Sequence, residues 1–222
     1  MKKLTRSQRK LQRKKIKTST TAENKLLSAV KRLFKISLPE KASMEDVKSS
    51  FAKINKSAID PYINRYTKDL LKNNRDGFQQ ILNAMVVGKS GNTDLQNSLD
   101  KAFHSLVQEE RIYKPLLSKF KENVKLIKNI PQHVQAKLQE GYEEGVSFRG
   151  TEVEKYLQET LGKRAKIIIR TESSKVNAAL TEIRAKELDI NGYVWSTSED
   201  QRVRASHKLM DGVLVFWDTV PT

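Results

Sequence analysis

Three side chains in the second half of the chain have the chemistry of a metal site. Glu172, Asp200 and His207 offer two carboxylates and an imidazole, which suit divalent metal ions and could be drawn as a nuclease centre. The position of Glu172 weighs against this interpretation, because on a helix it aligns with Ile169 and Val176 and so interrupts an apolar stripe. We therefore expect no catalytic residue, no bound metal and no cofactor.

A second catalytic interpretation rests on an arginine combined with a serine–threonine–serine segment. Arg170 with Ser196-Thr197-Ser198 resembles the pattern of ADP-ribosyltransferases. That chemistry also requires a later Glu-x-Glu, which activates the nucleophile and holds the ribose. The sequence has no glutamate after Glu199. The pattern is incomplete, and we expect no small-molecule substrate.

The apolar stripe also predicts how Glu172 is used. A carboxylate among apolar residues is costly unless it meets a cation or takes up a proton. Arg202 and Arg204 belong to the next short helical segment and are the nearest cations by motif. We expect one of them to pair with Glu172 and to pin the second helix onto the first.

The other polar and aromatic residues of this region have simple structural interpretations. His207 falls on the apolar side of its short helix, and we expect it in the core. Trp195 and Trp217 are expected to be core aromatics. We expect Asp200 at the start of a helix, where the helix dipole favours an acid, and Asp211-Gly212 in a tight turn.

The N-terminal segment 1–19 is set apart by its charge. The chain has a formal net charge of +16, and this segment contains no acid and nine cations: Lys2, Lys3, Arg6, Arg9, Lys10, Arg13, Lys14, Lys15 and Lys17. With few apolar residues, it is expected to be a flexible arm. A run of one sign suits a polyanion, and no base-reading motif or stacking platform accompanies it. We therefore expect nonspecific DNA binding, with an acidic protein surface as the alternative partner.

Composition excludes several other classes of protein. The 222 residues include no cysteine, which excludes disulfides, thiolate metal sites and cysteine nucleophiles. No apolar run approaches the roughly 18–20 residues of a membrane span. No apolar segment follows the basic N-terminus, as it would in a secretory signal. We expect a protein without a membrane partner, acting in a cytoplasm or inside a particle assembled there.

Hydrophobic periodicity predicts that the first half of the chain, residues 20–128, is entirely helical. Thr20 to Glu23 has the spacing of a capping box, which opens the first helix. The polar residues 72–77 read as a break. A long helical stretch follows over residues 95–127, and we expect Pro115 to kink or divide it.

The second half, residues 129–222, is expected to be a small α+β module, so that the whole chain is α+β and predominantly α-helical. A capping box at Thr151 to Glu154 opens a short helix that Gly162 closes, and a longer helix spans about 163–189. The order helix, strand, helix, strand then follows from two alternating segments, residues 193–197 and 213–217.

Three elements in a fixed order carry a resemblance to a known family. They are Arg170-Thr171-Glu172 on a helix, Gly192-Tyr193-Val194-Trp195 on a strand, and an Asp-x-Arg-x-Arg-x-x-His segment with a hydrophobic-Asp-Gly turn, represented by Asp200, Arg202, Arg204, His207 and Met210-Asp211-Gly212. In order and spacing they resemble the domain of tailed-bacteriophage minor head proteins of the phage Mu F-like group. The resemblance covers roughly residues 124–222.

The resemblance implies a minor capsid protein of phage head morphogenesis, with its motif residues in structural roles. It implies a few copies in each virion, at the portal vertex or the capsid interior, after procapsid assembly in the host bacterial cytoplasm. The implied partners are the portal protein, capsid or scaffold proteins, and packaged DNA. The family usually continues into a Gly/Pro-rich loop and a cysteine-containing segment. The sequence stops at Thr222, so we expect a truncated domain or a shorter variant.

We therefore expect three parts: a basic flexible arm (1–19), a helical region (20–128) and a minor head α+β domain (129–222). Two alternatives stay open. One is a nonspecific nucleic-acid-binding protein of another system, and the other is the delivery half of a phage-derived toxin that lacks its effector domain. Portal and terminase genes upstream would favour the phage head protein. Salt-dependent DNA binding without capsid association would favour the first alternative.

Overall fold

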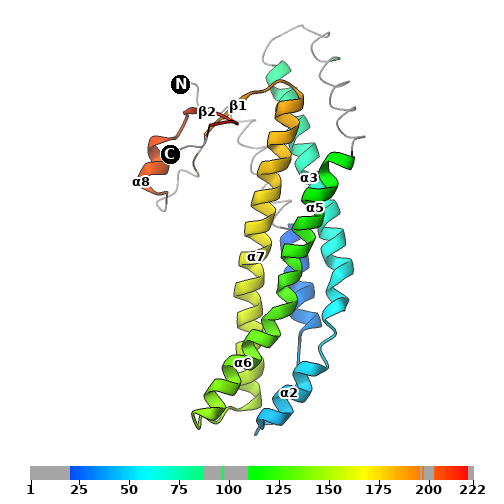
Figure 1. Ribbon diagram of the computed structural model, residues 1–222, viewed down its shortest axis with the longest axis vertical. Helices are drawn as coiled ribbons and strands as arrows, with labels where there is room; N and C mark the ends of the chain where they lie inside the picture. Colours follow the sequence, from blue (N-terminus) through cyan, green and yellow to red (C-terminus); the bar gives the residue numbers. More distant parts are fainter. Residues whose placement is uncertain (1–20, 88–96, 98–109, 196, 198–202, 220–222) are drawn as a thin grey trace.

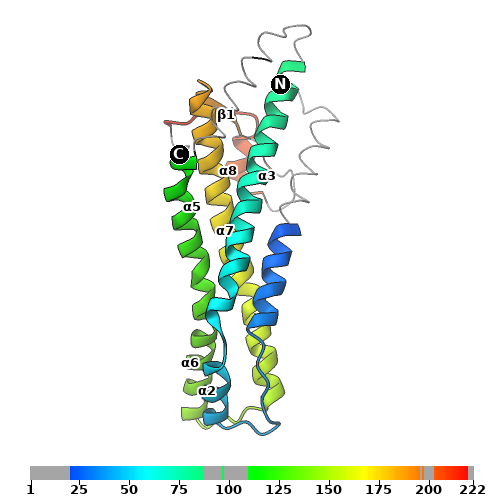
Figure 2. The same ribbon diagram turned by 90° about the vertical axis from the view of Figure 1, so that its right-hand side faces the viewer.

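Long helices packed side by side set the shape of the molecule. The computed structural model describes residues 21–87, 97, 110–195, 197 and 203–219. Three helices run along the long axis, with a fourth over residues 21–33 beside them (Figures 1 and 2): α3 (Asp60–Val87), α5 (Glu110–Lys125) and α7 (Gly150–Glu187). At the lower end in Figure 1, α2 (Met44–Ala52) packs against α6 (Ile130–Glu143). Short 3-10 turns, η1 (Lys56–Ile59) and η2 (Leu126–Asn129), lead into α3 and α6.

Local signals account for where several of these helices begin. Ser43 caps α2: its Oγ accepts from the Asp46 N–H at 3.1 Å, and its own N–H donates to the Asp46 carboxylate at 2.9 Å. The α6 helix has Pro131 in its first turn, where a missing N–H leaves no hydrogen bond unmade. These starts depend on neighbouring residues only, which makes them readable from the sequence.

One apolar core runs along the bundle. It draws buried side chains from residue 26 to residue 180, and therefore from both sides of the expected division at residue 129. In α7 the buried positions recur at steps of three and four residues, which makes one continuous stripe that faces the other helices: Val153, Leu157, Leu161, Ala165, Ile169, Ser173, Val176 and Leu180. Phe34, Ile59 and Phe120 pack opposite, each at most 1 % exposed.

The break expected at residues 72–77 is wrong, because α3 continues through it to Val87. Asn74 is buried there, and its Nδ2 donates to the main-chain oxygen of Asn177 at 3.2 Å and to Oγ1 of Thr181 at 3.3 Å. A polar run typical of a loop is thus held as helix by side-chain contacts with α7. Residues 103 or more positions apart make these contacts, so local sequence could not show them.

The helix end expected at Gly162 is also wrong, since α7 is one helix of 38 residues. A Cβ atom on Gly162 would lie 2.9 Å from Cε of Lys31, so the glycine permits close approach of helix 21–33. The cap lies earlier than expected: the Arg149 N–H donates to the Glu152 carboxylate at 3.0 Å. Glu154 instead accepts from the Leu38 N–H at 2.8 Å. Similarly, α5 runs on through Pro115 and is not divided by it.

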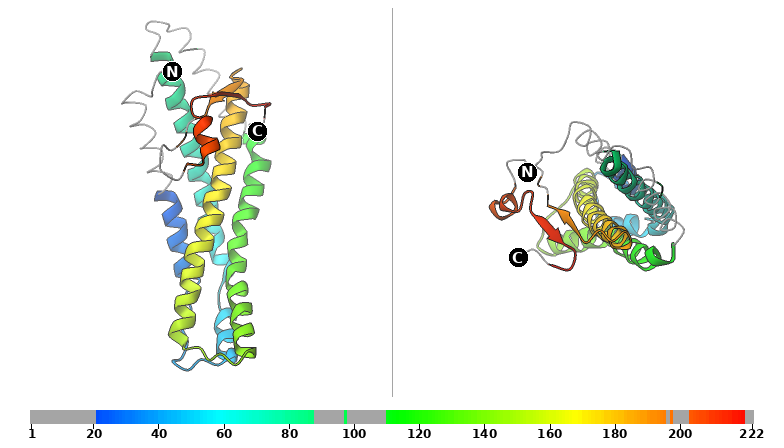
Figure 3. Two further views of the ribbon diagram at one scale, coloured as in Figure 1. Left: turned by 90° about the vertical axis from the view of Figure 1, so that its left-hand side faces the viewer. Right: turned by 90° about the horizontal axis from the view of Figure 1, so that it is seen from above.

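The C-terminal elements form a small module beside the upper end of α7 (Figures 1 and 3). Strands β1 (Gly192–Val194) and β2 (Leu214–Phe216) pair antiparallel, and α8 (Ala205–Leu209) lies between them in sequence. A second apolar cluster attaches the module to the bundle through Phe78 of α3 and Ala185 of α7. The expected order of helix, strand, helix and strand is confirmed, and the chain is predominantly helical with a small two-stranded sheet. Among the described helices, none has the length and apolar character needed to cross a membrane.

Candidate functional site: a polar brace across the bundle

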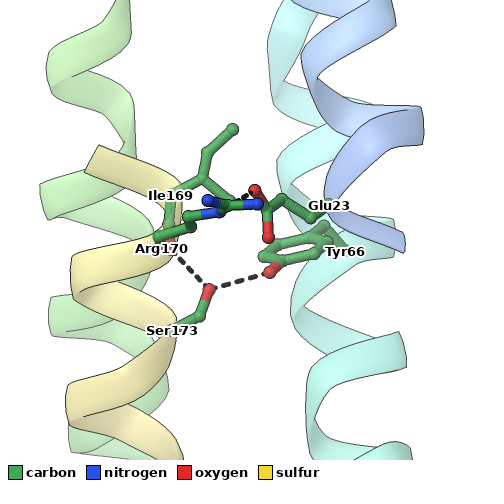
Figure 4. A network of polar contacts seen from close by, with 5 residues as sticks. All are labelled: Glu23, Tyr66, Ile169, Arg170 and Ser173. Carbon is green, nitrogen blue, oxygen red and sulfur yellow. Dashed lines mark hydrogen bonds and ion pairs between the residues drawn. The ribbon is translucent and has the colours of Figure 1, made fainter. Parts of the chain in front are cut away.

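Arg170 of α7 joins the motif region to the first helix. Its Nε donates to Oε1 of Glu23 at 2.6 Å (Figure 4). The Glu23 side chain is only 9 % exposed, whereas that of Arg170 is 53 % exposed. A largely buried carboxylate is therefore neutralised by a cation that reaches it from the surface.

Ser173, one turn further along α7, bonds to α3. Its Oγ lies 2.6 Å from the carbonyl oxygen of Ile169 and 2.8 Å from the hydroxyl of Tyr66 (Figure 4). A carbonyl oxygen can only accept, so the hydroxyl proton of Ser173 points to Ile169 and Tyr66 donates to Ser173. Burial raises the pKa of Tyr66 above its ordinary value, and the charge of Glu23 raises it further. Tyr66 is thus a protonated donor at neutral pH.

Glu172 turns to a third helix, α5. Its carboxylate accepts from Lys175 at 2.8 Å and from Nδ2 of Asn123 at 2.6 Å. The hydrogen bond from Lys175, and then that from Asn123, lower the pKa of Glu172 below its ordinary value of 4.5. The expectation of a cationic partner is confirmed, but the partner is a neighbour on the same helix.

The expected contact between Glu172 and Arg204 is wrong. Arg204 is exposed on the module, where it precedes α8. Arg202, the other expected partner, lies outside the described residues. The carboxylate faces α5 because α7 is embedded in the bundle along its whole length. The short helix carries the nearest cations of the motif, but the cation that binds Glu172 is Lys175, three residues along α7.

Within four residues, α7 therefore makes polar contacts with three other helices. Arg170 reaches helix 21–33, Glu172 reaches α5 and Ser173 reaches α3. Thr171, between them, is exposed. Each of the three bonded side chains is occupied by a protein partner. In the part of the chain that the structure describes, no three acidic or histidine side chains gather as a metal site. The geometry is that of a brace between helices.

In the module, Asp211 and Gly212 form the expected tight turn. Oδ1 of Asp211 accepts from the N–H of Thr197 at 2.8 Å and from its hydroxyl at 3.2 Å. Gly212 has a φ of 80°, a conformation that favours glycine, and its N–H donates to the Trp195 carbonyl at 2.7 Å. Asp200 lies outside the described residues.

His207 is exposed, so the expectation that it lies in the core is wrong. Its ring meets Trp195 edge-on with centroids 5.6 Å apart. Trp195 and Trp217 are half-buried, and Nε1 of Trp217 donates to the Ile190 carbonyl at 2.9 Å. Helical spacing correctly assigns residues to a common face. However, α8 has only five residues, and no described layer covers that face.

Five residues of the brace were not identified from the sequence as site residues: Glu23, Tyr66, Asn123, Ser173 and Lys175. A signal existed for Glu23, which precedes Leu26, Leu27 and Val30 at helical spacing and interrupts their stripe as Glu172 does. Its place in a capping pattern offered a sufficient local explanation. The pairing itself has no sequence signal, because 147 positions separate Glu23 from Arg170.

The lowered pKa of Glu172 predicts a pH-dependent contribution to stability. A carboxylate with a depressed folded-state pKa stabilises the fold above its ordinary pKa, and this stabilisation is lost as the pH falls through the folded value. The difference in Tm between wild type and Glu172→Gln should therefore be largest above pH 4.5 and should shrink in more acidic buffer. Thermal melts between pH 7 and pH 3 measure it, with the exposed Glu159→Gln as control. A difference that is the same at all pH values would contradict the prediction.

Fold and site together define a structural helix bundle with an appended α+β module. Residues 130–222 match the family described as "Phage Mu protein F like protein", so this part of the chain is similar to that family. The chain is also 39 % identical, over 105 residues, to an uncharacterized protein of Haemophilus influenzae. The aligned part is 45 % of this chain and 23 % of that relative, so the chain spans under a quarter of the relative's length. No solved structure matches the chain.

Proposed function

We propose that this chain is a minor capsid component that acts in phage head morphogenesis. In this role it associates with the portal vertex or the capsid interior and contacts DNA without sequence preference. The observation that carries the proposal is the match of residues 130–222 to the phage Mu F-like family. The contacts of the family motif agree with a structural role, because Arg170 and Glu172 are engaged with neighbouring helices.

The brace also supports a role for the first half of the chain. Arg170, Glu172 and Ser173 lie inside the family region, and their partners Glu23, Asn123 and Tyr66 lie before it. The family region thus depends on the N-terminal helices for its core and for its polar contacts. We infer that head assembly uses the bundle as one rigid body with the module at one end.

Co-purification from phage-producing cells tests the association. An affinity-tagged full chain should bring down portal or major capsid protein, and should sediment with procapsids in a sucrose gradient. The control is the same gradient from cells in which the portal gene is disrupted, which separates a portal contact from a capsid contact. A chain that stays at the top of the gradient in both strains would contradict the proposal.

The N-terminal arm is the proposed DNA contact, although its residues lie outside the described part of the chain. Its nine cations can each neutralise a phosphate, and each neutralised phosphate adds about −0.9 to the slope of log K against log salt. Deleting residues 1–17 should therefore weaken binding to a mixed-sequence duplex roughly tenfold or more at 0.1 M salt and flatten the slope. Fluorescence anisotropy measures both quantities. Unchanged binding would contradict the role of the arm.

The same charge favours a second candidate function, a nonspecific nucleic-acid-binding protein of another system. The two candidates give different results in the experiments above. Salt-dependent duplex binding without sedimentation with procapsids would favour the second candidate. Sedimentation with procapsids favours the first, whatever the affinity for DNA.

A further inference from the structure

A row of cations follows the seam between helix 21–33 and α7. Two contacts bring these helices together: Arg170 binds Glu23, and Nε2 of Gln158 donates to the Lys31 carbonyl at 3.2 Å. Between them, Gly162 lets the aliphatic stem of Lys31 lie against α7. The exposed cations on the two sides of this line form what we call the basic seam: Lys31, Lys35, Lys155, Lys163, Lys166 and Arg170.

Few acids offset the charge of the basic seam. Glu23 is paired with Arg170, and Glu154 holds the N–H of Leu38. Between residues 160 and 171, α7 contains no acid, and Arg164 adds a further exposed cation there. Glu159 is the exposed acid along this part of α7. The basic seam therefore keeps a positive surplus after the internal ion pair is counted.

The end of the rod where α2 and α6 meet carries exposed charges of both signs (Figure 1). Five exposed glutamates lie on or next to these helices: Glu40, Glu45, Glu140, Glu143 and Glu144. Five exposed cations offset them at the same end: Lys41, Lys48, Lys53, Lys137 and Arg149. This end is therefore close to neutral, and a polyanion would be attracted more strongly to the basic seam than to it.

The form of the basic seam fits the phosphate backbone of a duplex. Lys155 and Arg170 lie 15 residues apart, which at about 1.5 Å per residue is roughly 22 Å along a straight helix. Duplex DNA presents one charge for about every 1.7 Å of its axis, so several phosphates lie within that length. Centres of protein interfaces are depleted in charged residues, which makes an acidic protein a poorer fit.

We propose that the basic seam is a second contact for double-stranded nucleic acid, in addition to the N-terminal arm. The proposal rests on the proposed function, which assigns DNA contact to the arm alone. The arm joins helix 21–33 at Thr21, two residues before the glutamate that binds Arg170. The arm and the basic seam are therefore close to each other along the chain. Lysines dominate the basic seam, and they act on phosphates as point charges, so the contact is independent of base sequence.

A matched pair of triple variants tests the basic seam. The first, Lys155→Gln with Lys163→Gln and Lys166→Gln, removes three charges from it. The second, Lys41→Gln with Lys48→Gln and Lys53→Gln, removes three exposed charges near the α2–α6 end. Both triple variants lower the net charge by the same amount, so a difference between their affinities shows that the position of the charges matters. Binding of a fluorescein-labelled mixed-sequence duplex of 20 base pairs is followed against NaCl concentration, in the full chain and in the chain lacking residues 1–17. Circular dichroism melts check that each variant is folded.

The seam triple should flatten the salt slope by up to about 2.7 in the full chain, and the control triple by less than about 1. The chain without its arm should keep a salt-dependent affinity that the seam triple abolishes. If the two triple variants change the salt slope equally, the proposed role of the basic seam is wrong, and the proposed role of the arm is unaffected. A full chain that does not bind the duplex would overturn both proposals. If the full chain binds the duplex but the chain without residues 1–17 does not bind it at all, only the proposed role of the basic seam is contradicted.

Discussion

Replacing Arg170 by alanine should lower the free energy of unfolding by about 2 kcal/mol. This value lies between the contribution of an exposed ion pair, up to about 1 kcal/mol, and the cost of breaking a buried ion pair, about 3–5 kcal/mol. The reason lies with its partner. The Glu23 side chain is only 9 % exposed, and without Arg170 it would be a poorly solvated carboxylate with no cation. Urea denaturation followed by circular dichroism measures the change.

A double-mutant cycle separates this charge effect from lost packing. Glu23→Gln removes the buried charge, so adding it to Arg170→Ala should restore part of the lost stability, although it destabilises the otherwise unchanged protein. Lys163→Ala, on the same helix and exposed, should change stability by no more than about 0.5 kcal/mol. If the double variant is less stable than Arg170→Ala alone, the ion pair is not what holds these helices together.

Gly150→Ala should destabilise the bundle by about 3 kcal/mol, the upper end of what overpacking usually costs. A Cβ atom on Gly150 would lie 2.1 Å from the carbonyl oxygen of Pro39 and 2.9 Å from Cβ of Leu38. The neighbour is main chain, which cannot rotate away as a side chain can. The Gly150 N–H also donates to the Glu40 carbonyl at 3.0 Å, so relief of the clash would break this bond.

Gly162→Ala is the matched control, since both glycines belong to α7. Its added Cβ would meet only the flexible end of Lys31. Alanine is favoured over glycine inside a helix by about 0.5–1 kcal/mol, so this variant should be as stable as wild type or slightly more so. Chemical denaturation of the two variants side by side gives the comparison. Equal destabilisation would mean that the Pro39 contact has no special role.

The structure also explains why the sequence patterns predicted breaks inside α3 and α7, which are continuous helices. Residues 72–77 and Gly162 carry residue types that favour turns when they are free. In the bundle, the Asn74 side chain donates hydrogen bonds to α7, and Gly162 lies inside the helix with room beside it for the end of the Lys31 side chain. Packing along a 38-residue helix outweighs these local preferences.

The sequence by itself determined the features that depend on neighbouring residues. Periodicity predicted the apolar stripe of α7, and turn chemistry predicted the turn at Asp211-Gly212. The spacing of Arg170, Glu172 and Trp195 with the later motif residues led to the phage Mu F-like family, which the match over residues 130–222 confirms.

Only the tertiary structure decided what the motif residues contact. The sequence correctly predicted that Glu172 has a cationic partner. In the folded chain its partners are Lys175 and Asn123, and not Arg204. His207 is exposed to solvent because no element among the described residues covers that side of α8. Helical spacing determines which residues share a face, whereas the opposing surface comes from residues roughly 50 to 150 positions away. A single sequence contains no local record of those distant pairings.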